Sequence, residues 1–366
     1  MSTLIPADVL AKADKVLFIT HLALGDFTYL QNDFRAFAAA YPHIEVHLWV
    51  DEVRRTTDAS KWEGLKKYSL YDWVEACPFF AKIYKRTYSP ALLEESIREA
   101  QAENYAVVVS LATLRPHLYA SMARRISPQG FVAGMVKKVK FFQPHHALAY
   151  RKLDAAIPPY AVDRDNPQHI SDVYADWFRQ LCGLDVTPAE RLPFVQIPAE
   201  WNRYAAEQIE RWGAQEKKRV FINPYAKTKK RCWPLERVGE LIVALRELPA
   251  WHDTFFIVNA MPSELPAVQA MLAARGLAGV VAFSATDNFF QLPAVLARCD
   301  LIVSVETAVM HLANAVHVPV IALMRQKNPE WVPVDRANSV VITAEKRSDW
   351  VDAIPAGRVI DALNKQ

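Results

Sequence analysis

Glycine is scarce in this 366-residue sequence, which contains ten, under half of the usual share of roughly 7%. No G-x-G-x-x-G spacing of a dinucleotide-binding turn occurs, and neither does a phosphate-binding loop with its lysine. The sequence therefore argues against an NAD-dependent enzyme and against a P-loop kinase.

Cysteine and long apolar runs are also rare. The four cysteines, which form no C-x-x-C pair, are interpreted as reduced thiols of a cytoplasmic protein: Cys77, Cys182, Cys232 and Cys299. The start of the chain lacks the apolar core of a signal peptide. No apolar run reaches the roughly 18 residues that a membrane span needs. We therefore expect a cytoplasmic location, with only peripheral contact with the inner face of the inner membrane.

The chain does contain a regular alternation of strand-like and helix-like segments. Before the proline-rich stretch Thr187–Pro198, strands are expected at 15–20, 44–50 and 105–110, with helices at 27–40 and 172–181. After it, strands are expected at 219–223, 254–259, 280–283, 301–305 and 318–324, with helices at 234–248, 263–274, 289–297 and 350–364. Such β-α-β units are typical of a parallel sheet covered by helices.

The alternation predicts an α/β protein with two Rossmann-like domains, whose parallel sheets face a central cleft. The N-terminal domain is expected over residues 1–186 and the C-terminal domain over 199–345, with a linker between them. Residues 346–366 are expected to form a terminal helix that packs back toward the N-terminal domain.

The most informative motif is LIVSVETAVMHLANAVHVPVIALMR, at 301–325. It predicts a buried strand, a short helix that begins at Glu306, and a second buried strand. A helix N-terminus at the end of a parallel strand offers free N–H groups and a partial positive charge to a phosphate. From the sequence alone, Glu306 and Thr307 could also be an ordinary helix start, and His311 could be an ordinary packed residue of that helix.

Two further segments carry candidate chemistry. The basic loop NPYAKTKKRCWP, at 223–234, is either a solvated run of charge or a clamp for a departing diphosphate. Gly25–Asp26 lies between the first strand and the first helix. Asp26 either caps that helix or acts as a general base on an acceptor hydroxyl.

Residues 104–153 contain no Asp or Glu but eight basic residues: Arg115, Arg124, Arg125, Lys137, Lys138, Lys140, Arg151 and Lys152. Two interpretations stay open. These residues belong to an ordinary surface on which basic side chains cluster by chance, or they attract an anionic acceptor or an anionic membrane face. Nucleic acid fits less well, because the domain pattern matches no nucleic-acid module. No spacing among His145, His146 and His169 predicts a metal site. Asp163–Arg164–Asp165 is interpreted as a surface turn.

Taken together, these motifs resemble glycosyltransferase family 9, the heptosyltransferases. The family signature is a strand, Asp-Thr-Gly, two variable residues and His-Leu-Ala. Here Thr307 and His311–Ala313 match it, Glu306 replaces Asp and Ala308 replaces Gly. Trp233–Pro234 also matches, and Arg231 occupies the place of a diphosphate-binding lysine. Gly25–Asp26 matches a turn whose aspartate is the proposed base.

The resemblance implies a GT-B fold and an inverting, metal-independent transfer of heptose from ADP-heptose to lipopolysaccharide core, without a cofactor. Asp26 would be the catalytic base. The donor would contact Lys227, Thr228, Lys230, Arg231, Glu264, Glu306, Thr307, Ala308 and His311. The anionic acceptor would contact Arg115, Arg124, Arg125, Lys137, Lys138 and Lys140. Two alternatives stay open: a UDP- or GDP-sugar donor for another cell-surface polysaccharide, and a catalytically silent relative that only binds saccharide.

Overall fold

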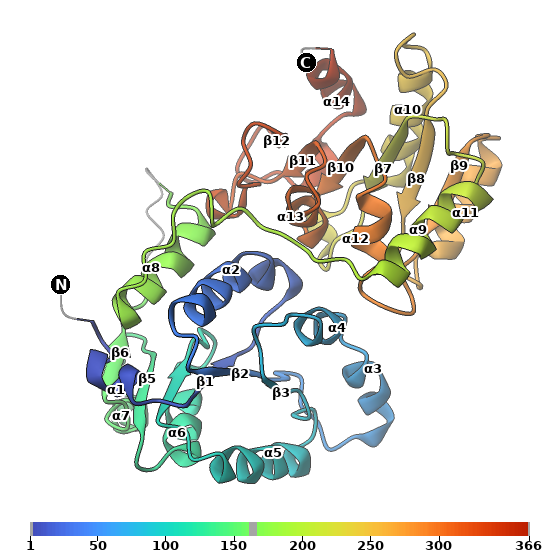
Figure 1. Ribbon diagram of the computed structural model, residues 1–366. Coiled ribbons are helices and arrows are strands. Elements are labelled where there is room, and N and C mark those ends of the chain that lie inside the picture. The colour runs from blue at the N-terminus through green and yellow to red at the C-terminus, as the bar shows by residue number, and fades with distance from the viewer. Residues whose placement is uncertain (1–2, 161–166, 365–366) are drawn as a thin grey trace. The chain divides into compact units, whose positions relative to one another are not determined.

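The computed structural model describes residues 3–160 and 167–364. It divides into two compact units, Met1–Arg191 and Leu192–Gln366, and the boundary falls within the proline-rich stretch Thr187–Pro198 (Figure 1). Asp163–Arg164–Asp165 lies outside the described residues.

The first unit is built on a six-stranded parallel sheet with the order β3-β2-β1-β4-β5-β6. Its strands are β1 (Lys15–Thr20), β2 (Glu45–Val50), β3 (Lys82–Tyr84), β4 (Val107–Ser110), β5 (Phe131–Met135) and β6 (Ala155–Ile157). Its helices are α1 (Ala7–Ala11), α2 (Leu24–Ala40), α3 (Trp62–Lys66), α4 (Leu70–Glu75), α5 (Pro90–Ala102), α6 (Pro116–Ile126), α7 (Pro144–Tyr150) and α8 (Ile170–Cys182), with the 3-10 turn η1 (Ala59–Lys61).

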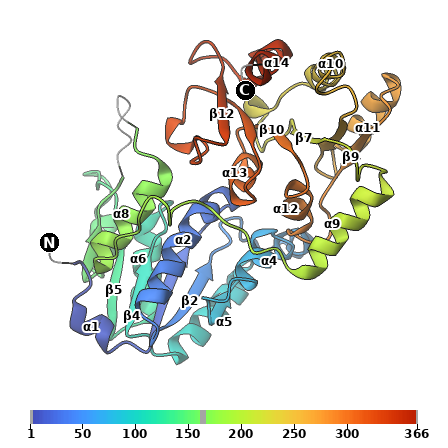
Figure 2. The ribbon, with the colours of Figure 1, turned by 45° about the horizontal axis from the view of Figure 1, so that its top comes forward.

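Helices cover both faces of this sheet, which is why its central strands are continuous apolar runs. Leu17 and Ile19 of β1 belong to the core that packs against α5 and α6. Phe18 points to the opposite face, where its ring contacts Phe34 of α2 and Phe178 of α8. Figure 2 shows α2 and α8 side by side on that face.

The second unit repeats the architecture, with the strand order β12-β11-β10-β7-β8-β9, again all parallel. Its strands are β7 (Arg219–Asn223), β8 (Phe255–Asn259), β9 (Val280–Phe283), β10 (Leu301–Val305), β11 (Val320–Met324) and β12 (Ser339–Thr343). Its helices are α9 (Ala199–Arg211), α10 (Leu235–Arg246), α11 (Leu265–Ala274), α12 (Gln291–Leu296), α13 (Ala308–Ala315) and α14 (Ala356–Leu363), with the turns η2 (Lys229–Arg231), η3 (Pro329–Trp331) and η4 (Val351–Ala353). The prediction of an α/β protein with two parallel sheets is confirmed.

Two helices differ from the sequence prediction by more than two residues. α2 begins at Leu24 rather than at Phe27, because the Asp26 carboxylate accepts the Ala23 N–H and so stabilises an earlier first turn. The expected helix at 350–364 divides into η4 and α14, since Pro355 interrupts it. α14 packs on α10 and β12 of its own unit. Its expected packing toward the N-terminal domain stays a prediction.

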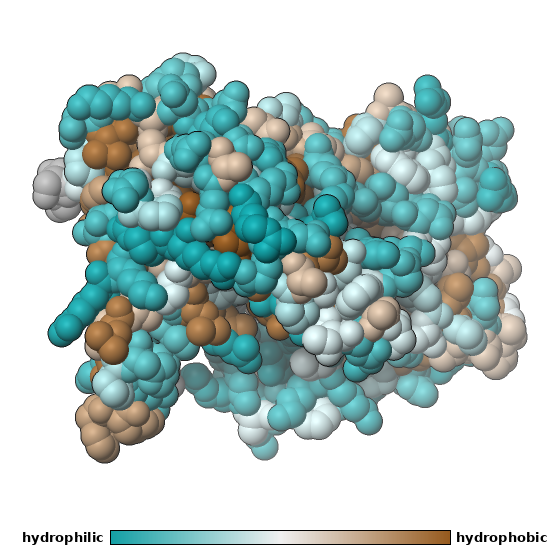
Figure 3. Space-filling model, turned by 90° about the horizontal axis from the view of Figure 1, so that it is seen from below, coloured by the Kyte–Doolittle hydropathy of each residue, from teal (hydrophilic) through white to brown (hydrophobic). Residues whose placement is uncertain are grey.

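No helix within residues 3–160 and 167–364 combines the length and the apolar composition of a membrane span. The face of the molecule in Figure 3 is mostly hydrophilic, and its hydrophobic residues lie in small separate groups.

Candidate active site

The carboxyl ends of three neighbouring strands in the second unit are joined by side-chain amides. The Nδ2 atom of Asn223, at the end of β7, donates to Thr307 Oγ1 at 3.0 Å and to Ser304 Oγ at 3.1 Å. Asn259, at the end of β8, donates from Nδ2 to Asn223 Oδ1 at 2.9 Å. Because Asn223 lies opposite Ser304 in the parallel register, these bonds fix the end of β7 against the start of α13.

Thr307 caps helix α13. Its Oγ1 accepts the N–H of Val309 at 3.3 Å, and Ala308 is the first helical residue. This start lies at the carboxyl edge of the sheet, where the N–H groups of a first turn and their partial positive charge suit a phosphate. Thr307 and Ala308 therefore form the first turn at this edge, and their contact with a donor stays a prediction.

Glu306, the acidic residue of the motif, is buried, with a relative exposure of 3%. Arg325 donates to it twice, from Nε to Oε2 and from a terminal nitrogen to Oε1, each at 3.1 Å. Asn328 Nδ2 also donates to Oε1, at 3.1 Å. Both carboxylate oxygens are thus engaged within the unit, which gives Glu306 a structural task. His311 is buried as well, and its ring lies 5.9 Å from that of Trp331, centroid to centroid.

The basic loop that follows β7 is closed by Trp233. Its backbone N–H donates to Pro224 O at 2.8 Å, and its buried indole donates from Nε1 to Ile354 O at 2.8 Å. Lys227, Thr228 and Lys230 are exposed on this loop. An exposed loop of fixed ends that carries several cations can hold a diphosphate by charge-assisted hydrogen bonds.

Arg231 is half-buried at the end of η2, and its Nε donates to Thr228 Oγ1 at 3.2 Å. The Lys230 ammonium lies 5.6 Å from the centre of the Trp350 ring. Glu264 is half-buried just before α11. Burial, and secondarily the charge of Glu264, raises the pKa of Tyr225, a residue of the basic loop, to about 12.

In the first unit, Asp26 is the third residue of α2. Its Oδ2 accepts the backbone N–H of Ala23 at 3.2 Å, and its Oδ1 accepts the hydroxyl of Tyr174 at 2.9 Å. Burial raises the pKa of Asp26, and the two hydrogen bonds lower it by less, so that the carboxylate is more basic than an exposed one. Once ionised, a carboxylate of raised pKa is better suited to remove a proton.

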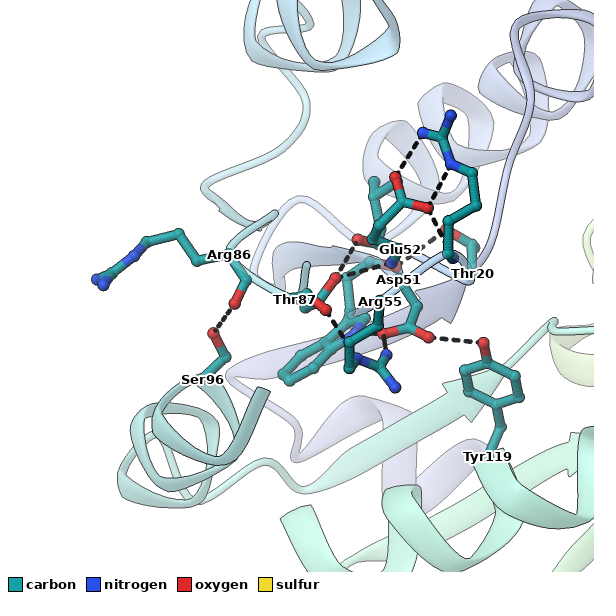
Figure 4. A network of polar contacts seen from close by, with 11 residues as sticks. Thr20, Asp51, Glu52, Arg55, Arg86, Thr87, Ser96 and Tyr119 are labelled. Atoms are coloured by element: carbon teal, nitrogen blue, oxygen red, sulfur yellow. Dashed lines mark hydrogen bonds and ion pairs between the residues drawn. The ribbon is translucent and has the colours of Figure 1, made fainter. Parts of the chain in front are cut away.

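Polar side chains also gather after β2, at the same edge of the first sheet (Figure 4). Asp51 is buried, accepts the hydroxyl of Tyr119 at 2.7 Å and pairs with Arg55 at 2.5 Å. Beside it, the backbone N–H of Glu52 donates to Thr87 Oγ1 at 2.8 Å. Asp51, Arg55 and Tyr119 of this network line a groove of about 1050 Å³, together with residues of α5 and α6.

Only three of the six residues that are predicted to bind the acceptor line this groove. Arg115, Arg124 and Arg125 line it. Arg124 pairs with Asp154 at 2.6 Å, and Arg125 with Glu94 at 2.9 Å, so both are committed to structural ion pairs. Arg115 is exposed at the start of α6. The remaining members, Lys137, Lys138 and Lys140, are exposed between β5 and α7 and are not among the lining residues.

Sequence reasoning missed several residues of both edges. Asn223 and Asn259 are the last residues of their strands, and Asp51 directly follows β2, so a polar residue after a run of apolar ones was the available signal. Arg325 also follows a strand, but its pairing with Glu306 depends on adjacent strands and leaves no local pattern.

Comparisons with known proteins agree with this architecture. Three solved structures are similar in fold: a family 9 glycosyltransferase from Veillonella parvula (TM-score 0.72, 18% identity, 96% of each chain covered), Escherichia coli ADP-heptose LPS heptosyltransferase II (0.66, 17%, 96% of this chain and 98% of that one) and E. coli heptosyltransferase WaaC with ADP (0.64, 16%, 96% and 97%). No curated protein sequence matches the chain.

The model of glycosyltransferase family 9 (heptosyltransferase) matches residues 95–351, which is well over half of the chain. The match spans α6, the basic loop after β7 and the start of α13. The chain therefore belongs to glycosyltransferase family 9 and is a glycosyltransferase with a GT-B fold.

Proposed function

We propose that the protein transfers a heptose from ADP-heptose to lipopolysaccharide core, with inversion at the anomeric carbon and without a metal at the diphosphate. The observation that carries this proposal is the placement of a basic loop and a helix start after β7 and β10, neighbouring strands whose ends are joined by Asn223. A heptosyltransferase of similar fold is solved with ADP, which supports the choice of nucleotide.

The second unit would bind the donor. Arg231, Lys230 and Lys227 would offset the charge that the diphosphate gains as it departs, together with the first turn of α13. Thr307 and Ala308 would line this phosphate site, and Thr228 would add a hydroxyl. Glu264 would accept hydrogen bonds from the ribose. Glu306 and His311 would support the start and the body of α13 from inside the unit.

The first unit would supply the base and the acceptor site. Asp26 takes the proton of an acceptor hydroxyl as its oxygen forms a bond to the anomeric carbon. The bond from that carbon to the diphosphate breaks on the opposite face, through an oxocarbenium-like state, and ADP leaves with the electron pair. The groove, lined by the exposed Arg115, would hold the carboxylates and phosphates of the anionic acceptor.

The segment between β5 and α7 would contact an anionic membrane surface. Phe141 is 96% exposed and Phe142 59% exposed, next to the exposed Lys137, Lys138 and Lys140. Aromatic side chains that enter the headgroup region, combined with lysines that attract anionic lipid, are typical of peripheral binding.

We expect the double variant Phe141→Ser/Phe142→Ser to bind vesicles of phosphatidylglycerol and phosphatidylcholine several-fold more weakly than the unaltered protein, because it loses both exposed rings. Co-sedimentation at low and high salt would measure this. Val243→Ser, which removes an exposed apolar side chain from α10, is the matched control. Equal binding of the vesicles by Phe141→Ser/Phe142→Ser and by Val243→Ser would contradict the proposed membrane contact.

Nucleotide choice is tested by thermal shift and calorimetry with ADP, UDP and GDP. We expect ADP to stabilise the protein most, and Arg231→Ala to weaken ADP binding by about 10- to 100-fold, because a charge-assisted hydrogen bond contributes roughly 1.5–3 kcal/mol. Arg237→Ala, on the outer face of α10, is the control and should leave ADP binding unchanged.

The same experiment separates the rival functions. Stronger stabilisation by UDP or GDP would favour another sugar donor, for which the buried Glu306–Arg325 pair and the added methyl of Ala308 are specific reasons. Failure of all three nucleotides to bind would favour a catalytically silent saccharide-binding protein.

A further inference from the structure

Three histidines from two helices meet at the carboxyl edge of the first sheet. His117 is the second residue of α6, which follows β4, and His145 and His146 begin α7, which follows β5. β4 and β5 are neighbouring parallel strands, so the two helices start side by side. The ring centroids of His117 and His146 lie 3.7 Å apart, and those of His145 and His146 4.4 Å.

We propose that His117, His145 and His146 bind one divalent transition-metal ion, with Zn²⁺ as the preferred ion. One ring nitrogen of each residue lies within 4.8 Å of those of the other two. Tetrahedral Zn²⁺, with Zn–N bonds of about 2.0–2.1 Å, needs these nitrogens about 3.3 Å apart. His145 is exposed and the other two rings are half-buried, so the rings have room for the small side-chain rotation that would close this difference.

The donor set determines which class of metal fits. Three imidazoles suit Zn²⁺, Ni²⁺ and Cu²⁺, whereas Mg²⁺ and Ca²⁺ require oxygen ligands. Residues 104–153, which include all three histidines, contain no Asp or Glu. The cluster thus offers lone pairs without carboxylates, in a region rich in positive charge, where a hydrated hard cation gains little.

Three protein ligands leave a fourth position open, as in catalytic rather than structural zinc sites. Arg115 and Leu118, which flank His117 at the start of α6, both line the groove described above. A metal held by the histidines would therefore lie beside the groove and bind an anionic oxygen, such as the carboxylate of a keto-acid sugar. This last assignment, of the acceptor as the source of that carboxylate, rests on the proposed function. The metal itself would take no part in the departure of the diphosphate.

Metal binding is measured on the full chain, first stripped with EDTA and then freed of chelator, in competition with a chromophoric chelator for Zn²⁺. We expect the unaltered protein to bind one Zn²⁺ per chain. His117→Ala or His146→Ala should bind it at least about tenfold more weakly, and the double variant His117→Ala/His146→Ala should not bind it. His252→Ala, in the second unit, is the matched control and should bind as the unaltered protein does. Far-UV circular dichroism checks that each variant is folded.

Two outcomes would overturn the site: equal Zn²⁺ binding by the double variant, or a Co²⁺-loaded protein with only the weak absorption of octahedral aquo Co²⁺. A tetrahedral Co²⁺ spectrum that acetate shifts supports the open position, and one that acetate leaves unchanged refutes it. Because no donor or acceptor is present in these measurements, their failure is independent of any failure of heptose transfer.

Discussion

Replacement of Asp26 by asparagine is expected to lower kcat by about 10²–10⁴-fold, the usual contribution of a general base. Asparagine retains the size of the side chain and its carbonyl still accepts the hydrogen bond of Tyr174, but it cannot take the acceptor proton. Because the donor is bound by the second unit in the proposed scheme, the affinity for ADP should change little. Initial rates of transfer from ADP-heptose to a truncated lipopolysaccharide core, together with calorimetry of ADP binding, measure both quantities.

Tyr174→Phe is the matched control for the Asp26 variant. In the unaltered protein the Tyr174 hydroxyl donates to the ionised carboxylate of Asp26 and so lowers its pKa. Without that hydroxyl, burial raises the pKa of Asp26 further. Since the base acts only when ionised, the acid limb of the pH profile of kcat/KM should move to higher pH while kcat on the alkaline side is retained. Turnover by Asp26→Asn at the unaltered rate would contradict the assignment of the base.

The second large effect is on stability. Glu306→Ala is expected to lower the free energy of unfolding by about 3–5 kcal/mol, the usual result of removing one partner of a buried ion pair. Arg325, whose side chain is only 13% exposed, would keep its charge without the two hydrogen bonds to Glu306. Urea denaturation followed by circular dichroism measures the change.

The double variant Glu306→Gln/Arg325→Met is the control for that result. It removes both charges, and the glutamine carbonyl still accepts from Asn328 Nδ2, so most of the lost stability should return. A Glu306→Ala protein that unfolds at the same urea concentration as the unaltered chain would show that the pair is not structural. If Glu306→Gln/Arg325→Met is stable but no longer binds ADP, the Glu306–Arg325 pair takes part in donor binding as well as in stability.

The central strands of both sheets were predictable because burial on two faces leaves a continuous apolar run, as at Leu301–Val305. The strands that the alternation did not reveal are the edge strands β3, β6 and β12 and the inner strand β5, which contains Gly134. Short edge strands are half-covered and carry mixed residues, so neither an apolar run nor a strict alternation marks them. The start of α2 was placed three residues late, since its stabilising contact is a single side-chain bond.

The candidate site divides in the same way. Sequence identified the residues that follow strands, such as Asp26, Thr307 and Arg231, because chain order alone places them at the carboxyl edge. It could not show that the carboxylate of Glu306 turns inward, which depends on Arg325, the residue that follows the adjacent strand. His117 and His145 lie on different helices, so no spacing along the chain reveals that they meet. Only the order of the strands does.

The hydrogen bond from the Trp233 indole to Ile354 O joins the end of the basic loop to a carbonyl 121 residues later in the chain. Removal of the carboxyl-terminal residues up to and including Ile354 would leave the buried indole N–H without this acceptor and would loosen the end of the basic loop. Truncated versions made for crystallisation or fusion should therefore retain Ile354, because the loss of these residues would alter the loop that is proposed to bind the nucleotide.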